Sequence, residues 1–289
     1  NPNPAGACTD PFSRPLAAQL TEQLGKQFII DNRGGAGGTV GASVAAKAAP
    51  DGYTWFIGAS HHTIAPSMYK TLDYDIQKSF IPIALLASVP QVLVVNPGRV
   101  NARNLKDFIA LMKKNPGKYN FASAGSGTVH HLAGELFKIQ TGTFIVHIPY
   151  RGAGPAMSDL LAGQVDLEFD GLGTSAPQIN AGKLFAIAVA ADKRNPAIPN
   201  VPTFAEAGLP DYKVSTWYAM FAPAGTPKPI VDKMTAEVQK ALNNPKLKAI
   251  WASNGAETPN LYGPAFGQLV AADVKRWAEV VQKSGAKLD

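Results

Sequence analysis

The stretch SAGSGTVHHLAGELF, residues 123–137, decides the fold class of this chain of 289 residues. Five of its first six residues are glycine, alanine or serine, and the residues that follow have the spacing of an amphipathic helix. The segment before it, KYNFAS at 118–123, has the composition of a short strand. A strand, a loop of small residues and a helix in succession form the unit from which α/β folds are built.

The same alternation of strand and helix continues along the chain. Further strands are predicted at 27–32, 54–59, 89–97, 144–150, 165–170, 184–191 and 214–223. Helices are predicted at 9–25, 39–49, 105–115, 156–163 and 174–182. Pro82 and Pro90 divide the apolar stretch 80–95 into two buried strands, and Thr203 and Glu206 have capping-box spacing before a short helix.

The C-terminal part is predicted to be helical, because apolar residues recur there at helical spacing. These residues form two stripes that we expect to face a core: Ile230, Met234 and Val238, and then Phe266, Val270, Val274, Trp277 and Val281.

Composition and charge exclude several classes of protein. The net charge of +6 suggests an anionic partner, but no basic run carries interleaved aromatic residues, so no nucleic-acid partner is expected. The longest apolar stretch is interrupted by prolines and is too short to span a membrane. Cys8 is the only cysteine, so no intrachain disulfide can form. Residues 1–10 lack the charged and apolar regions of a signal peptide.

Two loops of small residues precede helices, at 123–128 and at 5–10. Small residues let the backbone approach a ligand, and the free N–H groups of a helix N-terminus favour an anion. Neither loop contains the Gly-Lys-Ser/Thr of a P-loop, so a carboxylate or another small oxyanion fits better than a nucleoside triphosphate. The alternative is that both are ordinary capped helix starts.

Other kinds of site are less well supported by spacing. Gly35 and Gly37 imitate a dinucleotide fingerprint, but Val40 stands where its third glycine belongs. Ser126 lacks the spacing of a nucleophile elbow, although His130 or His131 as a base and Asp170 as its partner leave a hydrolase or transferase open. The histidine doublets are poorly spaced for chelation, because adjacent helical side chains diverge. We therefore expect no metal and no cofactor.

Seven segments together resemble the substrate-binding proteins of tripartite tricarboxylate transporters, the Bug family. They are NRGGAGG (32–38), AAKAAPDGYT (45–54), FASAGSGTVHHLAGELF (121–137), VHIPYRGAGPAMSDLLAGQVD (146–166), FDGL (169–172), VPTFAEAGLPDY (201–212) and FAPAGTPKPIVDKM (221–234). The resemblance implies a two-lobed α/β fold of the periplasmic binding protein type, a type II Venus flytrap. We assign residues 1–98 and 224–289 to the first lobe and 99–223 to the second.

The resemblance also implies roles for residues of the first lobe. The loop at 4–10 matches the family's glycine-rich segment, which places Ala7, Cys8, Thr9 and Asp10 at the ligand. Cys8 stands where the family commonly has glycine. The segment GASHH places Ser60, His61 and His62 near the mouth of the cleft.

In the second lobe, SAGSGT matches the family's carboxylate loop. The resemblance therefore implies that Ser123, Ser126, Gly127 and Thr128 hold a carboxylate, and that Phe169, Asp170 and Gly171 lie at the cleft. Because imidazoles donate hydrogen bonds and stack on flat rings, the doublet at 61–62 suggests a dicarboxylate, aromatic like terephthalate or phthalate. The alternative is that this doublet is an exposed loop tip.

As a member of this family the protein would be a periplasmic, monomeric receptor without enzymatic activity. It would capture a small carboxylate and deliver it to the membrane permease subunits of a tripartite tricarboxylate transporter. The competing hypothesis is a hydrolase or transferase that uses Ser126 as its nucleophile.

Overall fold

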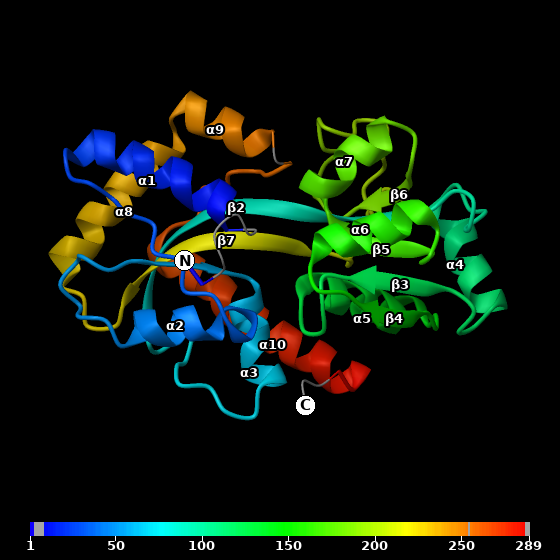
Figure 1. Cartoon of the computed structure of the whole chain (residues 1–289), viewed down its shortest axis with the longest axis horizontal. Helices are drawn as coiled ribbons and strands as arrows, with labels where there is room; N and C mark the ends of the chain where they lie inside the picture. Colours follow the sequence, from blue (N-terminus) through cyan, green and yellow to red (C-terminus); the bar gives the residue numbers. More distant parts are fainter. Residues whose placement is uncertain (3–8, 254, 287–289) are drawn as a thin grey trace. The chain divides into compact units, whose positions relative to one another are not determined.

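The computed structural model describes residues 1–2, 9–253 and 255–286, and Figure 1 shows its helices and strands. The chain divides into two compact units, Asn1–Ser88 with Trp217–Ala278, and Val89–Thr216 with Glu279–Asp289. The last helix, α10 (Gly263–Ser284), begins in the first unit and ends in the second. The chain also passes from one unit to the other inside two long strands, β2 (Phe80–Val95) and β7 (Ser215–Pro223). These passages lie earlier in the chain than the predicted lobe boundaries near 98 and 223, and the lobes themselves stay a prediction.

The first unit is built on three strands and covered by helices. β1 (Phe56–Ala59) pairs antiparallel with β7, with Phe56 opposite Phe221. α1 (Asp10–Leu24) packs against α8 (Lys228–Leu242) and α9 (Pro245–Ala252) on one side of the strands. α2 (Thr39–Ala46) and α3 (His61–Met68) lie on the other side (Figure 1).

The core of the first unit confirms the predicted helical stripe near the C-terminus. α10 (Gly263–Ser284) inserts Phe266 and Val270 into a cluster that includes Phe56, Trp217 and Phe221. Trp217 also donates its ring N–H to Asp273 of α10 at 2.7 Å, so the one polar atom of this indole has a partner. Apolar burial and one buried hydrogen bond together fix this helix on the sheet.

The second unit is an α/β sheet in which three strands run parallel. β3 (Asn120–Ser123) pairs in parallel with β4 (Val146–Pro149) and with β5 (Leu167–Gly171). The far part of β2 pairs antiparallel with β5 and with β6 (Phe185–Val189).

Four helices connect and cover these strands. They are α4 (Leu105–Lys114), α5 (Val129–Thr141), α6 (Ala153–Ala162) and α7 (Leu172–Asn180). The predicted helix of the opening stretch is α5, and the strand before it is β3, so this strand–loop–helix prediction is confirmed.

Three local predictions are wrong. β2 is a single strand that continues through both prolines, because backbone N–H groups on either side of Pro90, those of Ser88 and Gln91, still find partners. Residues 27–32 form no strand, and Ile29 keeps 77% of its surface exposed. The capping box forms, with the Thr203 and Glu206 side chains bonded to each other's backbone N–H, but only a turn follows.

Among the described helices, none is both long and apolar enough to cross a membrane.

Candidate functional site

The candidate site in the second unit lies where its three parallel strands end. Because β3 pairs in parallel with β4 and β5, their carboxyl ends meet at one edge of the sheet. α5, α6 and α7 begin just after these three strands, so three helix N-termini lie at this edge. Open α/β sheets bind their ligands at this edge, and helix N-termini carry partial positive charge. The arrangement suits an anion.

The loop between β3 and α5 satisfies many of its own polar groups. Gly125 and Gly127 have φ angles of 131° and 76°, which other residues rarely adopt. The Thr128 hydroxyl donates to the carbonyl of Gly125 at 2.7 Å, and Thr128 caps α5. The N–H groups of Gly125 and Gly127 donate to the Ser123 hydroxyl and to the ring of His131. The loop is therefore held rigidly in one conformation.

Ser126 is the exposed residue of this loop. The loop after β4 supports it, because the N–H groups of Tyr150 and Gly152 donate to the carbonyls of Ser123 and Ala124. Arg151 lies between these two donors; its side chain is exposed and has no ion-pair partner among the described residues. The sequence alone gives no signal for Arg151, because only strand pairing reveals that the two loops are neighbours.

Ser123 is fully buried, and its hydroxyl lies 2.6 Å from Nε2 of His147. The His147 ring stacks on His131, with ring centroids 3.8 Å apart and planes 10° from parallel. Burial lowers the pKa of His131 to about 4 and that of His147 to about 3, so both rings are neutral near pH 7. Because its hydroxyl is already committed, Ser123 is less available to a ligand than Ser126.

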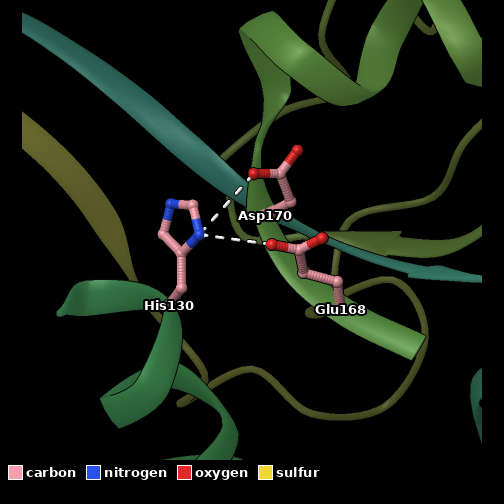
Figure 2. A group of neighbouring side chains, drawn as sticks. All are labelled: His130, Glu168 and Asp170. Atoms are coloured by element: carbon pink, nitrogen blue, oxygen red, sulfur yellow. Dashed lines mark ion pairs between the residues drawn. The ribbon is translucent and has the colours of Figure 1, made fainter. Parts of the chain in front are cut away.

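Three titratable side chains converge beside this loop. His130, the second residue of α5, points its Nδ1 toward Glu168 and Asp170 of β5 (Figure 2). The distances from Nδ1 to Glu168 Oε1 and Asp170 Oδ1 are 3.5 and 3.6 Å. Glu168 is fully buried in a central strand, paired with Val94 on one side and Ala122 on the other.

The charges of this cluster are strongly coupled. Burial, and then the neighbouring charge of Asp170, raise the pKa of Glu168 to about 7 against the opposing effect of His130. Burial disfavours the charged form of His130, but Glu168 and Asp170 outweigh it and raise the pKa of His130 above its ordinary value. The second carboxylate oxygen of Asp170 accepts hydrogen bonds from Thr174 and Ser175, the latter at 2.6 Å.

The remaining predicted residues of the second unit fall in two places. Phe169 is fully buried, with its ring against Phe121, Phe137 and Tyr212, so its side chain belongs to the core. Gly171 caps the start of α7 at the candidate edge.

Neither His130 nor His131 is placed to deprotonate Ser126, because His130 faces the two carboxylates and His131 accepts from Gly127.

In the first unit, Ser60 precedes α3, and His61 and His62 begin it. Nδ1 of His62 lies 3.1 Å from the backbone nitrogen and 3.0 Å from the carbonyl oxygen of Ala59. This buried ring therefore has a structural role, because it bonds to the backbone at the end of β1. The Ser60 hydroxyl and Nε2 of His61 are buried and have no hydrogen-bond partner in the described part of the chain. Unsatisfied buried polar atoms are uncommon, and these two are the better candidates for ligand contact.

The other predicted residues of the first unit precede or begin α1. Thr9 and Asp10 are buried, and Asp10 accepts from Asn32 and forms an ion pair with Arg14 at 2.9 Å. Ala7 and Cys8 lie outside the described residues. The predicted ligand contacts of this loop stay predictions.

A family model described as "Tripartite tricarboxylate transporter family receptor" matches residues 12–286 of the chain. Protein BugT of Bordetella pertussis is 37% identical over 290 residues, which cover 99% of this chain and 88% of BugT.

Solved structures of the same kind match along nearly the whole chain. The periplasmic binding protein BugD is 39% identical, with a TM-score of 0.83, and the match covers 99% of this chain and 97% of that one. Rpa4515 of R. palustris, solved with adipate, is 35% identical with a TM-score of 0.86, covering 99% and 96%. MatC of Rhodopseudomonas palustris, solved with malate, is 35% identical with a TM-score of 0.82, covering 97% and 96%.

Proposed function

Because this chain belongs to the family of tripartite tricarboxylate transporter receptors, we propose that it captures a small dicarboxylate in the periplasm and delivers it to the transporter's membrane permease subunits. Proteins of this family are solute-binding receptors, so binding without chemical conversion is its function. The receptor acts as a monomer in this proposal.

One observation carries the carboxylate part of the proposal. Three helix N-termini lie at one sheet edge, and the loop that begins one of them presents Ser126 to solvent. A carboxylate there would accept hydrogen bonds from Ser126 and from free backbone N–H groups, and the exposed Arg151 guanidinium would add charge. We propose that Ser126 and Arg151 hold one carboxylate of the ligand.

The relatives support two carboxylates in the ligand. Adipate and malate, the acids with which two of the matching structures were solved, are both dicarboxylates. We propose that the second carboxylate binds to the first unit, where the Ser60 hydroxyl and Nε2 of His61 lack partners among the described residues. For an aromatic diacid such as terephthalate or a phthalate, His61 rather than His62 is the proposed stacking partner, since His62 is bonded to the backbone of Ala59.

The test is a calorimetric panel with malate, succinate, adipate, terephthalate and benzoate against the purified protein. At least one diacid should bind at least tenfold more tightly than benzoate. His61→Ala should weaken the preferred diacid more than benzoate, since only the diacid reaches both units in this proposal. Equal affinities for monoacids and diacids would reject the dicarboxylate proposal, and recovery of an altered acid would reject a pure receptor.

A further inference from the structure

We propose that His130, Glu168 and Asp170 form a binding site for a divalent transition-metal ion, with Zn²⁺ as the representative ion. The sequence alone predicts no metal site, because the members of its two histidine doublets diverge. The three donors instead come from two elements, α5 and β5, that are brought together by the fold. The proposal concerns the second unit alone and does not depend on the identity of the transported acid.

The distances between donor atoms suit a small ion. Nδ1 of His130 lies 3.5 Å from Glu168 Oε1 and 3.6 Å from Asp170 Oδ1, and all three atoms lie within 4.8 Å of one another. Zinc bonds to nitrogen and oxygen are about 2.0–2.2 Å long, so two donors on a tetrahedral zinc lie roughly 3.3–3.6 Å apart. The two His130 separations already match that spacing, which is too long for a direct hydrogen bond.

The donor atoms also lack other partners. Both oxygens of Glu168, Oδ1 of Asp170 and Nδ1 of His130 are buried without a hydrogen bond to any residue that the structure describes. Glu168 is entirely buried, and its strand neighbours Val94 and Ala122 offer no polar side chain. His130 is the only ion-pair partner of these two carboxylates among the described residues, and one imidazole cannot balance two carboxylates. Buried charge in excess is costly, and it is normally paired or bound to a metal. In the cluster, Nδ1 of His130 thus faces one oxygen of Glu168 and one oxygen of Asp170 (Figure 2).

Other contacts hold one donor in place. Oδ2 of Asp170 accepts from Ser175 at 2.6 Å and also from Thr174, which fixes the carboxylate and leaves Oδ1 facing His130. Metal-binding carboxylates and imidazoles are commonly oriented in this way by hydrogen bonds from a surrounding shell. A site of this kind needs little rearrangement to bind an ion.

Charge and donor type select the kind of ion. Two carboxylates and a neutral imidazole sum to two negative charges, which a divalent cation neutralises. Imidazole suits zinc and other first-row transition metals, whereas Mg²⁺ prefers oxygen ligands only. The His130 side chain keeps 13% exposure, so the site opens toward solvent on the histidine side. We therefore expect Zn²⁺ to bind and Mg²⁺ to bind much more weakly.

The decisive experiment titrates Zn²⁺ into chelator-treated protein by calorimetry, in the absence of any organic acid. Wild type should bind one Zn²⁺ per chain, and excess Mg²⁺ should not compete. Glu168→Gln and His130→Asn should each weaken Zn²⁺ binding at least about tenfold, because losing even a residue that only orients a metal ligand costs about 10–100-fold. His147→Asn, which removes a histidine that faces Ser123 instead, should leave zinc affinity within about twofold of wild type.

X-ray absorption at the zinc edge identifies the ligands independently of the variants. One imidazole and oxygen donors at about 2.0–2.2 Å are expected for wild type. No stoichiometric binding, unchanged affinity in both cluster variants, or a zinc shell without imidazole would each overturn the proposal. Circular dichroism and thermal melts of the zinc-free variants establish that they are folded, so a loss of binding reports on the site.

Discussion

At the scale of single residues, this protein buries several polar side chains, and only some of their polar atoms have hydrogen-bond partners among the described residues. His62 is buried and neutral, and Asp10 is buried but paired. Glu168, His61 and Ser60 are buried with polar atoms that have no hydrogen-bond partner within the described ranges. Because such atoms cost stability, the second group marks positions that a ligand or ion would complete.

Ser126 and Thr128 should respond differently to removal of their hydroxyls. Ser126 is exposed, and a hydrogen bond to a charged carboxylate contributes about 1.5–3 kcal/mol, so Ser126→Ala should weaken acid binding roughly tenfold or more. Thr128 caps α5 and donates to Gly125, so Thr128→Ala should cost about 1 kcal/mol of stability. Calorimetry and urea unfolding measure both effects, with Thr128→Ser as the control that keeps the cap. Unchanged acid affinity in Ser126→Ala would remove Ser126 from the site.

His62 should make the protein sensitive to acid. Burial lowers its pKa from 6.5 to about 4, although backbone hydrogen bonds partly oppose this, and the rings of His61 and Tyr74 lie against it. Between pH 6.5 and pH 4, His62 is therefore protonated in the unfolded chain but stays neutral in the folded chain. Stability present above pH 6.5 is lost as the pH falls through this window, by about 3 kcal/mol from this residue.

The measurement compares urea unfolding of wild type and His62→Asn at several pH values. Asparagine retains an acceptor for the N–H of Ala59 but does not titrate. The two proteins should have the same pH slope above pH 7, and the variant should lose less stability between pH 6.5 and pH 4. Parallel curves across that window would contradict the assignment of this loss to His62.

At the scale of elements, α5 packs unusually close to the sheet. Gly134 lies in the middle of this helix, and a Cβ at that position would come within 2.3 Å of the Phe121 ring on β3. Gly154, near the start of α6, faces open space instead. The first glycine is needed for packing and the second is not.

This contrast gives a matched pair of substitutions. Alanine favours a helix by up to about 1 kcal/mol over glycine, but overpacking a core costs about 1–3 kcal/mol. Gly134→Ala should therefore destabilise the protein, whereas Gly154→Ala should be neutral or slightly stabilising. Thermal and urea unfolding measure both. A Gly134→Ala protein as stable as wild type would mean that α5 can move away from β3 at little cost.

At the scale of the whole molecule, the chain passes between its two units inside β2, inside β7 and again inside α10. Three crossings are few enough to act as a hinge, and a ligand that contacts both units would favour a closed arrangement. We predict that a saturating diacid lowers the radius of gyration in small-angle scattering. The control is Ser126→Ala at the same acid concentration, which is chosen below the dissociation constant of the variant so that the variant stays largely unbound. Identical curves for free and fully bound wild type would contradict closure.

The sequence by itself determined the α/β class, most helices and strands, the helical stripes of the core and the loop before α5. These features depend on local periodicity, capping residues and glycine, which each segment carries independently of its neighbours. The family could also be recognised, because its motifs are short stretches of consecutive residues.

Only the tertiary structure decided which residues meet. It joined the apolar stretch 80–95 into one strand. Proline has no N–H that needs a partner, and neighbouring segments accept hydrogen bonds from the N–H groups on either side of Pro90. It brought Arg151 beside the loop of Ser126, and it placed His130 against Glu168 and Asp170. In the sequence Glu168 is merely one charged residue in a strand. Strand pairing buries it between Val94 and Ala122, and that non-local burial turns an ordinary carboxylate into a candidate metal ligand.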